Sequence, residues 1–286
     1  MRTMAYVKVC ATLFVLTAVA WGVEGDSASG IISPVQATAR PMGLSIVGPV
    51  MLAGSDAAAA KFQKEFLPSI SQLLNVQLAE CKKINDSSYL LDPSRLQLNT
   101  ESDVRVYFIG EGAGYRNTVG FSVTETAAGK ADQKLIFPDA SSSVSTYDPA
   151  KNAVRSANMP LLPGDFVNLG TVDAKSMLDF FLISNGVNGG KSVFSTMAAN
   201  NPDHLNHVVS FAMANSPYLI LSFEDMLGGG DRDFNDVLIA VDIGQRNVAA
   251  LTGAPEPAML VVLGSFLLFA LGRRGRNSIP GGTANA

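Results

Sequence analysis

From residue 96 onward, short apolar runs alternate with clusters of glycine, asparagine, aspartate and proline. Runs of this length, rich in Val, Ile, Phe and Tyr and bounded by turn residues, predict β-strands. No helical pattern separates one run from the next, which favours an antiparallel arrangement. The pattern therefore predicts an all-β domain over residues 96–247, an antiparallel β-sandwich or jelly-roll-like fold. The expected strands cover residues 104–109, 118–124, 134–137, 165–169, 178–184, 192–196, 207–213, 218–224 and 237–243.

Apolar residues at helical spacing precede the strands. Ser55 or Asp56 can cap the start of this helix, and Pro68 is expected to kink or split it. We expect residues 55–95 to form a helical segment that packs on the sheet domain. The chain is expected to lose regular structure again at residues 244–253. Six apolar residues have this helical spacing, namely Phe62, Phe66, Ile70, Leu73, Leu74 and Leu78.

The N-terminus has the three zones of a secretory signal peptide. Arg2 and Lys8 come first, an apolar stretch follows, and the small-x-small pattern Ala18-Val19-Ala20 ends it. The stretch is shorter than the roughly 20 apolar residues that a membrane span needs. Residues 1–20 are therefore expected to be a cleaved signal peptide, and an uncleaved N-terminal anchor is the alternative. Residues 21–54 are small and polar with scattered glycine and proline, and are expected to be a linker.

The C-terminus combines Pro255-Glu256-Pro257, an apolar run over residues 258–271 and a cluster of three arginines, Arg273, Arg274 and Arg276. Arginines beside an apolar run favour the cytoplasmic side, so an ordinary C-terminal anchor is one interpretation. The arrangement also resembles the PEP-CTERM sorting signal. That resemblance implies that residues 248–286 are a tail recognised by exosortase and its sorting machinery and processed near the Pro-Glu-Pro. The protein would be anchored transiently in the membrane and end at the cell surface or outside the cell.

Charge excludes one class of partner. The chain has 21 basic and 25 acidic side chains, of which the two ends hold five basic and one acidic. Residues 21–250 therefore keep 16 basic and 24 acidic side chains, a net charge of −8. Such a domain repels the phosphates of nucleic acids and attracts cations, so nucleic acid is not an expected partner. Without the signal peptide one cysteine remains, Cys81, and an internal disulfide cannot form.

Carboxylates are concentrated in the loop between the last two expected strands. Like charges this close oppose one another's ionisation, and a divalent cation removes that repulsion. Calcium suits the loop because it accepts six to eight oxygens from carboxylates, amides and backbone carbonyls. We therefore expect a calcium site, and the alternative is that the side chains only cap turns. Its expected ligands are Asp231, Asp233, Asn235, Asp236, Glu224 and Asp225.

The loop is not predicted to be an EF-hand. Asp231, Asp233 and Asn235 match the first positions of that motif, but Asp236 stands where the motif requires glycine, and a strand follows instead of a helix. Phe234 is expected to fill the core and hold the loop in place. Glu111 lies in an upstream glycine-rich turn, where it is either an additional ligand or a solvated turn carboxylate.

The loop sequence Phe-Glu-Asp-Met-Leu-Gly-Gly-Gly-Asp-Arg-Asp-Phe-Asn-Asp, residues 223–236, resembles the hallmark of the domain of unknown function family 4114. Residues 110–117 and the string Leu162-Pro163-Gly164-Asp165 fit the same family, so the resemblance covers about residues 100–243. It implies a secreted β-domain with a calcium-associated adhesive or matrix role, in contact with extracellular polysaccharide or other surface proteins. It implies no established activity.

No catalytic motif stands out, and the chain is expected not to be an enzyme. His204 and His207 have a spacing that suits one face of a helix rather than of a strand, and no third zinc ligand is near in sequence. Paired carboxylates are also the catalytic groups of glycosidases. A secreted carbohydrate-active enzyme or lectin is therefore the alternative function. An aromatic-lined cleft with carboxylates about 5 or 9 Å apart would favour it.

Overall fold

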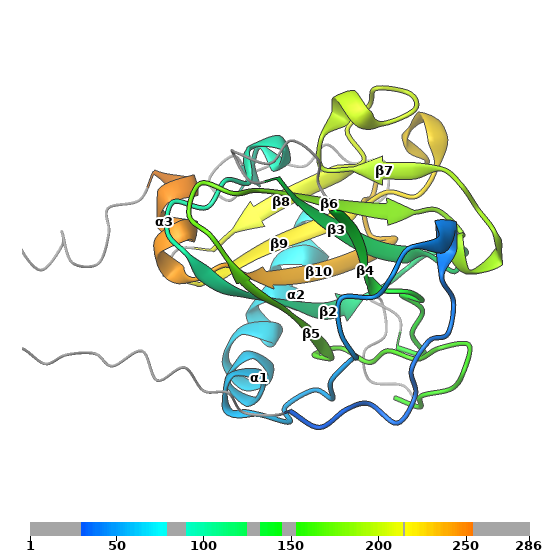
Figure 1. Cartoon of the computed structure of the whole chain (residues 1–286), viewed down its shortest axis with the longest axis horizontal. Coiled ribbons are helices and arrows are strands. Elements are labelled where there is room, and N and C mark those ends of the chain that lie inside the picture. Colours follow the sequence, from blue (N-terminus) through cyan, green and yellow to red (C-terminus); the bar gives the residue numbers. More distant parts are fainter. Residues whose placement is uncertain (1–29, 79–89, 125–131, 145–152, 214, 254–286) are drawn as a thin grey trace, which may run out of the picture.

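The computed structural model describes residues 30–78, 90–124, 132–144, 153–213 and 215–253 (Figure 1). In these residues the chain forms two antiparallel sheets and a preceding helical segment, which confirms the predicted all-β sandwich. The signal peptide, Cys81 and the sorting tail expected from the sequence lie outside the described residues. Among the helices of the described part, none is long and apolar enough to cross a membrane.

The two sheets contain six and four strands, and all nine expected strands are present. The two-residue strand β1 is an addition that the sequence pattern did not predict. In spatial order the larger sheet consists of β1 (Leu90–Leu91), β8 (Val208–Ala212), β9 (Tyr218–Phe223), β10 (Val237–Asp242), β2 (Ser102–Gly110) and β5 (Phe166–Val172). The smaller sheet consists of β4 (Asp132–Phe137), β3 (Thr118–Thr124), β6 (Met177–Ile183) and β7 (Val193–Ser195).

The larger sheet is apolar on both faces. Successive residues of a strand point to opposite faces, so Val106 and Phe108 of β2 enter the core between the sheets while Tyr107 points outward. All six residues of β9 are buried for the same reason. A sheet with two apolar faces needs a second covering layer besides the smaller sheet.

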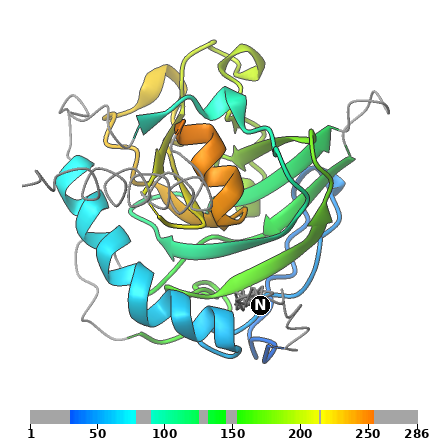
Figure 2. The ribbon, with the colours of Figure 1, turned by 90° about the vertical axis from the view of Figure 1, so that its left-hand side faces the viewer.

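The helical segment supplies that layer (Figure 2). It consists of α1 (Ala57–Lys61), a π-helical turn (Phe62–Phe66) and α2 (Leu67–Gln77), so the expected split near Pro68 occurs at the π-helical turn. Asp56 caps α1, because its carboxylate accepts a hydrogen bond of 2.7 Å from the backbone N–H of Ala59. Phe62 stacks on Tyr107 with ring centroids 4.0 Å apart.

Residues 30–54 differ from the linker expected over residues 21–54. Ile46 forms a β-bridge with Leu135 of β4, and Met51 forms one with Phe166 of β5. Leu44 and Ile46 pack over the outer face of the smaller sheet, and Met51 is buried on the outer face of the larger one. The linker interpretation is wrong for this segment, because a few apolar side chains and backbone hydrogen bonds hold a chain of otherwise loop-like composition.

The expectation that residues 244–253 lose regular structure is also wrong. They contain α3 (Gln245–Thr252), which lies across one end of the sandwich in Figure 2. Val248 enters the main core, and the buried side-chain oxygen of Asn247 accepts hydrogen bonds from the N–H groups of Asn99 (2.8 Å) and Thr100 (2.9 Å). The folded domain therefore extends past residue 247 and includes the first residues of the segment expected to be the tail, 248–286.

The Asp165 carboxylate contacts three segments of the chain and holds them together. Asp165 is fully buried, and its carboxylate pairs with both terminal nitrogens of the Arg155 guanidinium. It also accepts hydrogen bonds from the N–H groups of Ala53 (3.0 Å) and Leu162 (2.8 Å). The Leu162–Asp165 turn thus joins residues 30–54 to the sheet domain.

We expect Asp165→Ala to lower the free energy of unfolding by about 3–5 kcal/mol, because removing one member of a buried ion pair leaves the other uncompensated. Asp173→Ala is the matched control. This exposed carboxylate lies between β5 and β6, and its loss is expected to change stability by less than about 0.5 kcal/mol. Denaturant titration of both variants measures the difference. Equal midpoints would contradict the anchoring role of Asp165.

Candidate metal centre

The acidic loop begins and ends on neighbouring strands. Phe223, the last residue of β9, is paired with Val237, the first residue of β10, so Glu224 and Asp236 leave the sheet side by side. The loop is the gold segment with a short helical turn (Leu227–Gly229) in Figure 1. Strand pairing therefore fixes the positions of the two ends of the loop, independently of contacts within the loop.

Glycine is required at the centre of the loop. Gly228, Gly229 and Gly230 all have positive φ, as do Arg232 and Phe234 further on. A β-carbon on Gly230 would lie 1.9 Å from Oε1 of Glu224. Only glycine therefore lets the loop close over the Glu224 side chain.

Five of the six residues predicted as ligands form two overlapping groups of carboxylates. Within each group, one oxygen per residue lies within 4.8 Å of the others. Calcium–oxygen distances of 2.3–2.6 Å place two ligands of one ion up to about 5 Å apart, so each group has the dimensions of a calcium shell. One group is Glu224, Asp231 and Asp233, and the other is Glu224, Asp225 and Asp236.

Asn235, the sixth predicted residue, supports Asp233. Its backbone N–H donates to Oδ1 of Asp233 (3.1 Å), and its side-chain amide donates to Oδ2. The N–H of Asp225 likewise donates to Oδ2 of Asp236 (2.7 Å). These are turn caps of the kind that the alternative interpretation expects. Turn caps and metal ligation therefore share the same carboxylates in this loop.

One oxygen of Glu224 is not explained by turn capping. The Glu224 side chain is 1 % exposed, and Oε2 is buried without a hydrogen-bond partner in the structure. A buried carboxylate oxygen without a donor costs free energy unless a cation or a proton satisfies it. The all-oxygen donor set and this unsatisfied oxygen fit a calcium ion.

The electrostatics of the loop are those of a crowded anionic site. Burial, together with repulsion from Asp231, Asp225 and Asp233, raises the pKa of Glu224 to about 7. Burial and the neighbouring charge of Asp225 raise the pKa of Asp236 to about 8. Without a cation the site therefore holds protons close to neutral pH, and a divalent cation would compete with those protons.

The upstream glycine-rich turn folds back onto the acidic loop. The N–H of Gly112 donates to the carbonyl of Asn235 (2.9 Å), and the side-chain amide of Asn117 donates to Oδ2 of Asp225 (2.7 Å). Asn117 is a supporting residue that sequence reasoning missed, and its place in the motif of residues 110–117 was the available signal. Glu111 belongs to neither carboxylate group. Its Oε1 accepts a hydrogen bond from Ser142 (3.2 Å), and burial raises its pKa to about 7.

Phe234 and His207 have structural roles. Phe234 is partly buried and packs against the outer apolar cluster of the larger sheet. His207 is fully buried and stacks on Phe194, with Nε2 2.9 Å from a carboxylate oxygen of Asp203 and Nδ1 3.2 Å from the carbonyl oxygen of Glu224. Neither histidine is part of the two carboxylate groups. His207 therefore supports the backbone at Glu224 instead of facing a metal.

The acidic loop lies inside a segment that matches a known family model. Residues 172–244 match the model of DUF4114, a domain of unknown function. The DUF4114 match contains β6 to β10 and the whole acidic loop, and is narrower than the resemblance over residues 100–243 found in the sequence. No curated protein and no solved structure matches the chain.

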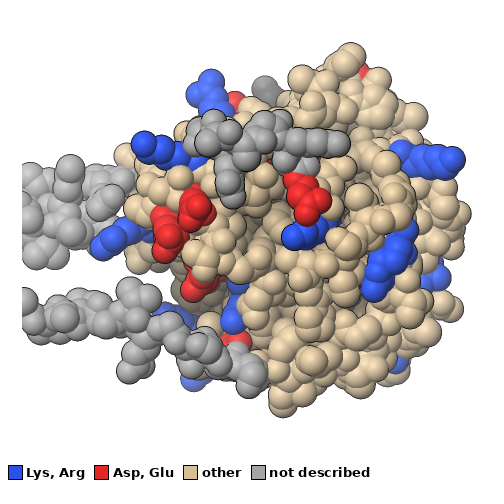
Figure 3. All heavy atoms as spheres, viewed as in Figure 1, with Lys and Arg blue, Asp and Glu red and all other residues tan. Residues whose placement is uncertain are grey.

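The surface itself is not uniformly acidic. On the face shown in Figure 3, small groups of basic and acidic side chains are scattered over a largely uncharged surface. Three of the five loop carboxylates, Glu224, Asp225 and Asp233, are buried. Part of the net negative charge is therefore held inside the loop and not displayed to solvent.

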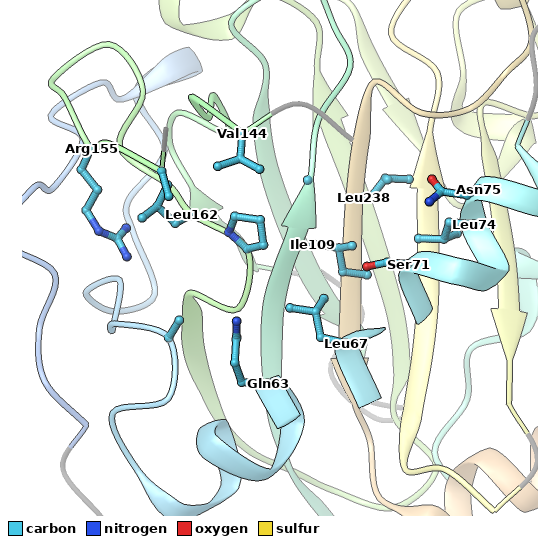
Figure 4. A pocket seen from close by; sticks show the side chains of 14 residues that line it. Gln63, Leu67, Ser71, Leu74, Asn75, Ile109, Val144, Arg155, Leu162 and Leu238 are labelled. Carbon is cyan, nitrogen blue, oxygen red and sulfur yellow. The ribbon is translucent and has the colours of Figure 1, made fainter. Parts of the chain in front are cut away.

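A separate pocket of about 430 Å³ opens between α2 and the turn around Leu162 (Figure 4). Leu67, Ile109 and Leu238 form much of its wall, and Arg155 lies at its edge. No aromatic ring and no carboxylate occurs among the described residues that line it. The pocket thus lacks the acid pair and stacking ring that the carbohydrate-active alternative would use.

We expect Gly230→Ala to abolish any stabilisation of the protein by calcium, because the new methyl group would displace Glu224. Gly228→Ala is the matched control. Gly228 also has positive φ, but a β-carbon there meets nothing within 4 Å. Each variant is compared with itself with and without calcium, so the melting curves separate backbone strain, which is larger at Gly230 (φ 45°, ψ −132°) than at Gly228 (φ 79°, ψ 1°), from loss of the site. Equal calcium responses in the two variants would contradict the proposed position of Glu224.

We expect the metal-free protein to lose stability as the pH rises from about 4 to about 8. The folded-state pKa values of Glu224 and Asp236, about 7 and about 8, lie above the ordinary values of 4.5 and 3.8. The folded chain therefore binds more protons than the unfolded chain in this window, and that stabilisation is lost as the protons leave. Melting curves in chelator across this range measure the trend. Asp236→Asn should flatten it, and a wild-type midpoint independent of pH would contradict it.

Proposed function

We propose that this chain is an exported, surface-sorted β-domain that binds calcium and has an adhesive or extracellular-matrix role. The observation that carries the calcium part is the buried, unsatisfied Oε2 of Glu224 among four further carboxylates. Export and surface location rest on the signal-peptide pattern and the PEP-CTERM-like tail of the sequence.

Calcium is favoured over other metals by the chemistry of the donors. The candidate ligands are all oxygen atoms, whereas zinc sites are built mainly from cysteine and histidine. Magnesium requires a regular octahedron and usually keeps several waters. An irregular set of carboxylates, several of them buried, suits the larger and more adaptable calcium shell.

An adhesive role is supported by apolar side chains on the same loop. Met226 is 49 % exposed and Leu227 is 57 % exposed. The N–H of Gly228, the next residue, donates to Asp203 (2.8 Å), so these side chains are held close to a second loop. A cation that orders the acidic loop would hold Met226 and Leu227 in position for a partner such as another surface protein.

We expect calcium to raise the melting temperature of the purified full chain. At ten times the dissociation constant the stabilisation is about 1.4 kcal/mol, and extracellular sites commonly have constants of about 0.1–1 mM. The corresponding shift is about 3–6 °C. Asp233→Asn, which keeps the size of the side chain, should reduce the shift, and the exposed Asp173→Asn should keep it in full.

Melting curves in chelator and in about 10 mM calcium, ten times the weak end of that range, provide the measurement. Magnesium at the same concentration should shift the midpoint less. If calcium leaves the wild-type midpoint unchanged, the calcium part of the proposed function is wrong, and turn capping accounts for the loop.

A further inference from the structure

Glu224 is shared by two groups of ligand atoms. The described residues do not bring all five carboxylates together as one set. Asp231 and Asp233 come from the tip of the loop, whereas Asp225 and Asp236 flank the ends of β9 and β10. Each group is held by its own hydrogen bonds, from Asn235 to Asp233 and from Asn117 to Asp225.

The two oxygens of Glu224 are inequivalent. Oε1 lies against Gly230, and the backbone N–H of Arg232 hydrogen-bonds the carboxylate. Oε2 is buried without a partner. A carboxylate can bind one cation through each of its two oxygens, and Glu224 is the residue that both groups require.

The charge of the loop also favours more than one cation. Five ionised carboxylates around a single divalent ion retain three negative charges, whereas two divalent ions leave one. Asp233 and Asp225 are almost completely buried, so water screens this repulsion poorly. Exposed Arg232 is the one basic residue of the loop.

We propose that the acidic loop binds two calcium ions joined by the Glu224 carboxylate. One ion lies with Asp231 and Asp233, and the other lies with Asp225 and Asp236. This inference rests on the proposed calcium binding and deepens it, because it specifies how many ions bind and which residue they share.

Calcium stoichiometry tests the proposal. The purified full chain, stripped of metal, is equilibrated with radioactive calcium in dialysis and the bound ions per chain are counted. We expect two ions in the wild type and in the exposed-site control Asp173→Asn. Asp231→Asn and Asp236→Asn should each retain one ion, because each removes a ligand from one group only. Circular dichroism establishes that each variant is folded.

The outcomes separate the two proposals. One ion in the wild type that is absent from both loop variants means a single shared site, which overturns the two-ion inference and leaves calcium binding intact. No bound ion in the wild type overturns both.

A measurement on the wild type alone guards against variants that fail to fold. With terbium and europium loaded together, a shared carboxylate places the two ions roughly 4 Å apart, by analogy with other two-metal sites. Efficient energy transfer from terbium to europium is then expected. Its absence at saturation contradicts a shared Glu224.

Discussion

Burial of both faces of the six-stranded sheet is the constraint on which the rest of the structure depends. One face packs on the smaller sheet, and the other presents Tyr107, Ile220 and their neighbours, which have to be covered. The amphipathic segment from α1 to α2 and residues 30–54 provide that cover. Arg105 joins these layers, because it pairs with Asp56 at the start of α1 (2.9 Å) and lies over the ring of Phe166 in β5. Segments that the sequence places outside the sheet domain are therefore part of its core.

The same packing makes the acidic loop possible. β9 and β10 are central strands with every residue from Tyr218 to Phe223 and from Val237 to Val241 buried. Strands held this firmly can present Glu224, Asp225 and Asp236 close together despite their mutual repulsion. Apolar burial elsewhere offsets the unfavourable electrostatic free energy of the carboxylate cluster, a common arrangement at functional sites.

Much of the fold could be predicted from the sequence because strand signals are local. Runs of β-branched and aromatic residues between turn clusters gave all nine expected strands. Local signals fail where tertiary contacts decide the structure. Helix α3 begins at Gln245, and Gly244 before it provides no side-chain cap. The position of the helix depends on Val248, which enters the core, and on Asn247, which hydrogen-bonds residues 99–100. Residues 30–54 have the composition of a loop, and isolated bridges through Ile46 and Met51 fix their course.

The candidate site likewise has a part that the sequence could predict and a part that it could not. Charge density along the chain pointed to the five carboxylates that the structure brings together in two groups, since that information is contained in one short segment. The distinct positions of Asn235 and Asn117 depend on contacts that composition does not encode. Asn117 lies 108 residues from Asp225, and Gly112 reaches Asn235 across a similar interval.

Those long sequence intervals have a kinetic consequence. Bringing together residues so far apart costs loop-closure entropy, so such contacts form slowly. A site completed by Asn117 and Gly112 would therefore be absent from the folding transition state, and a cation bound there would act mainly by slowing unfolding. For a protein exported as proposed, the benefit would be a longer lifetime of the folded state in the presence of proteases.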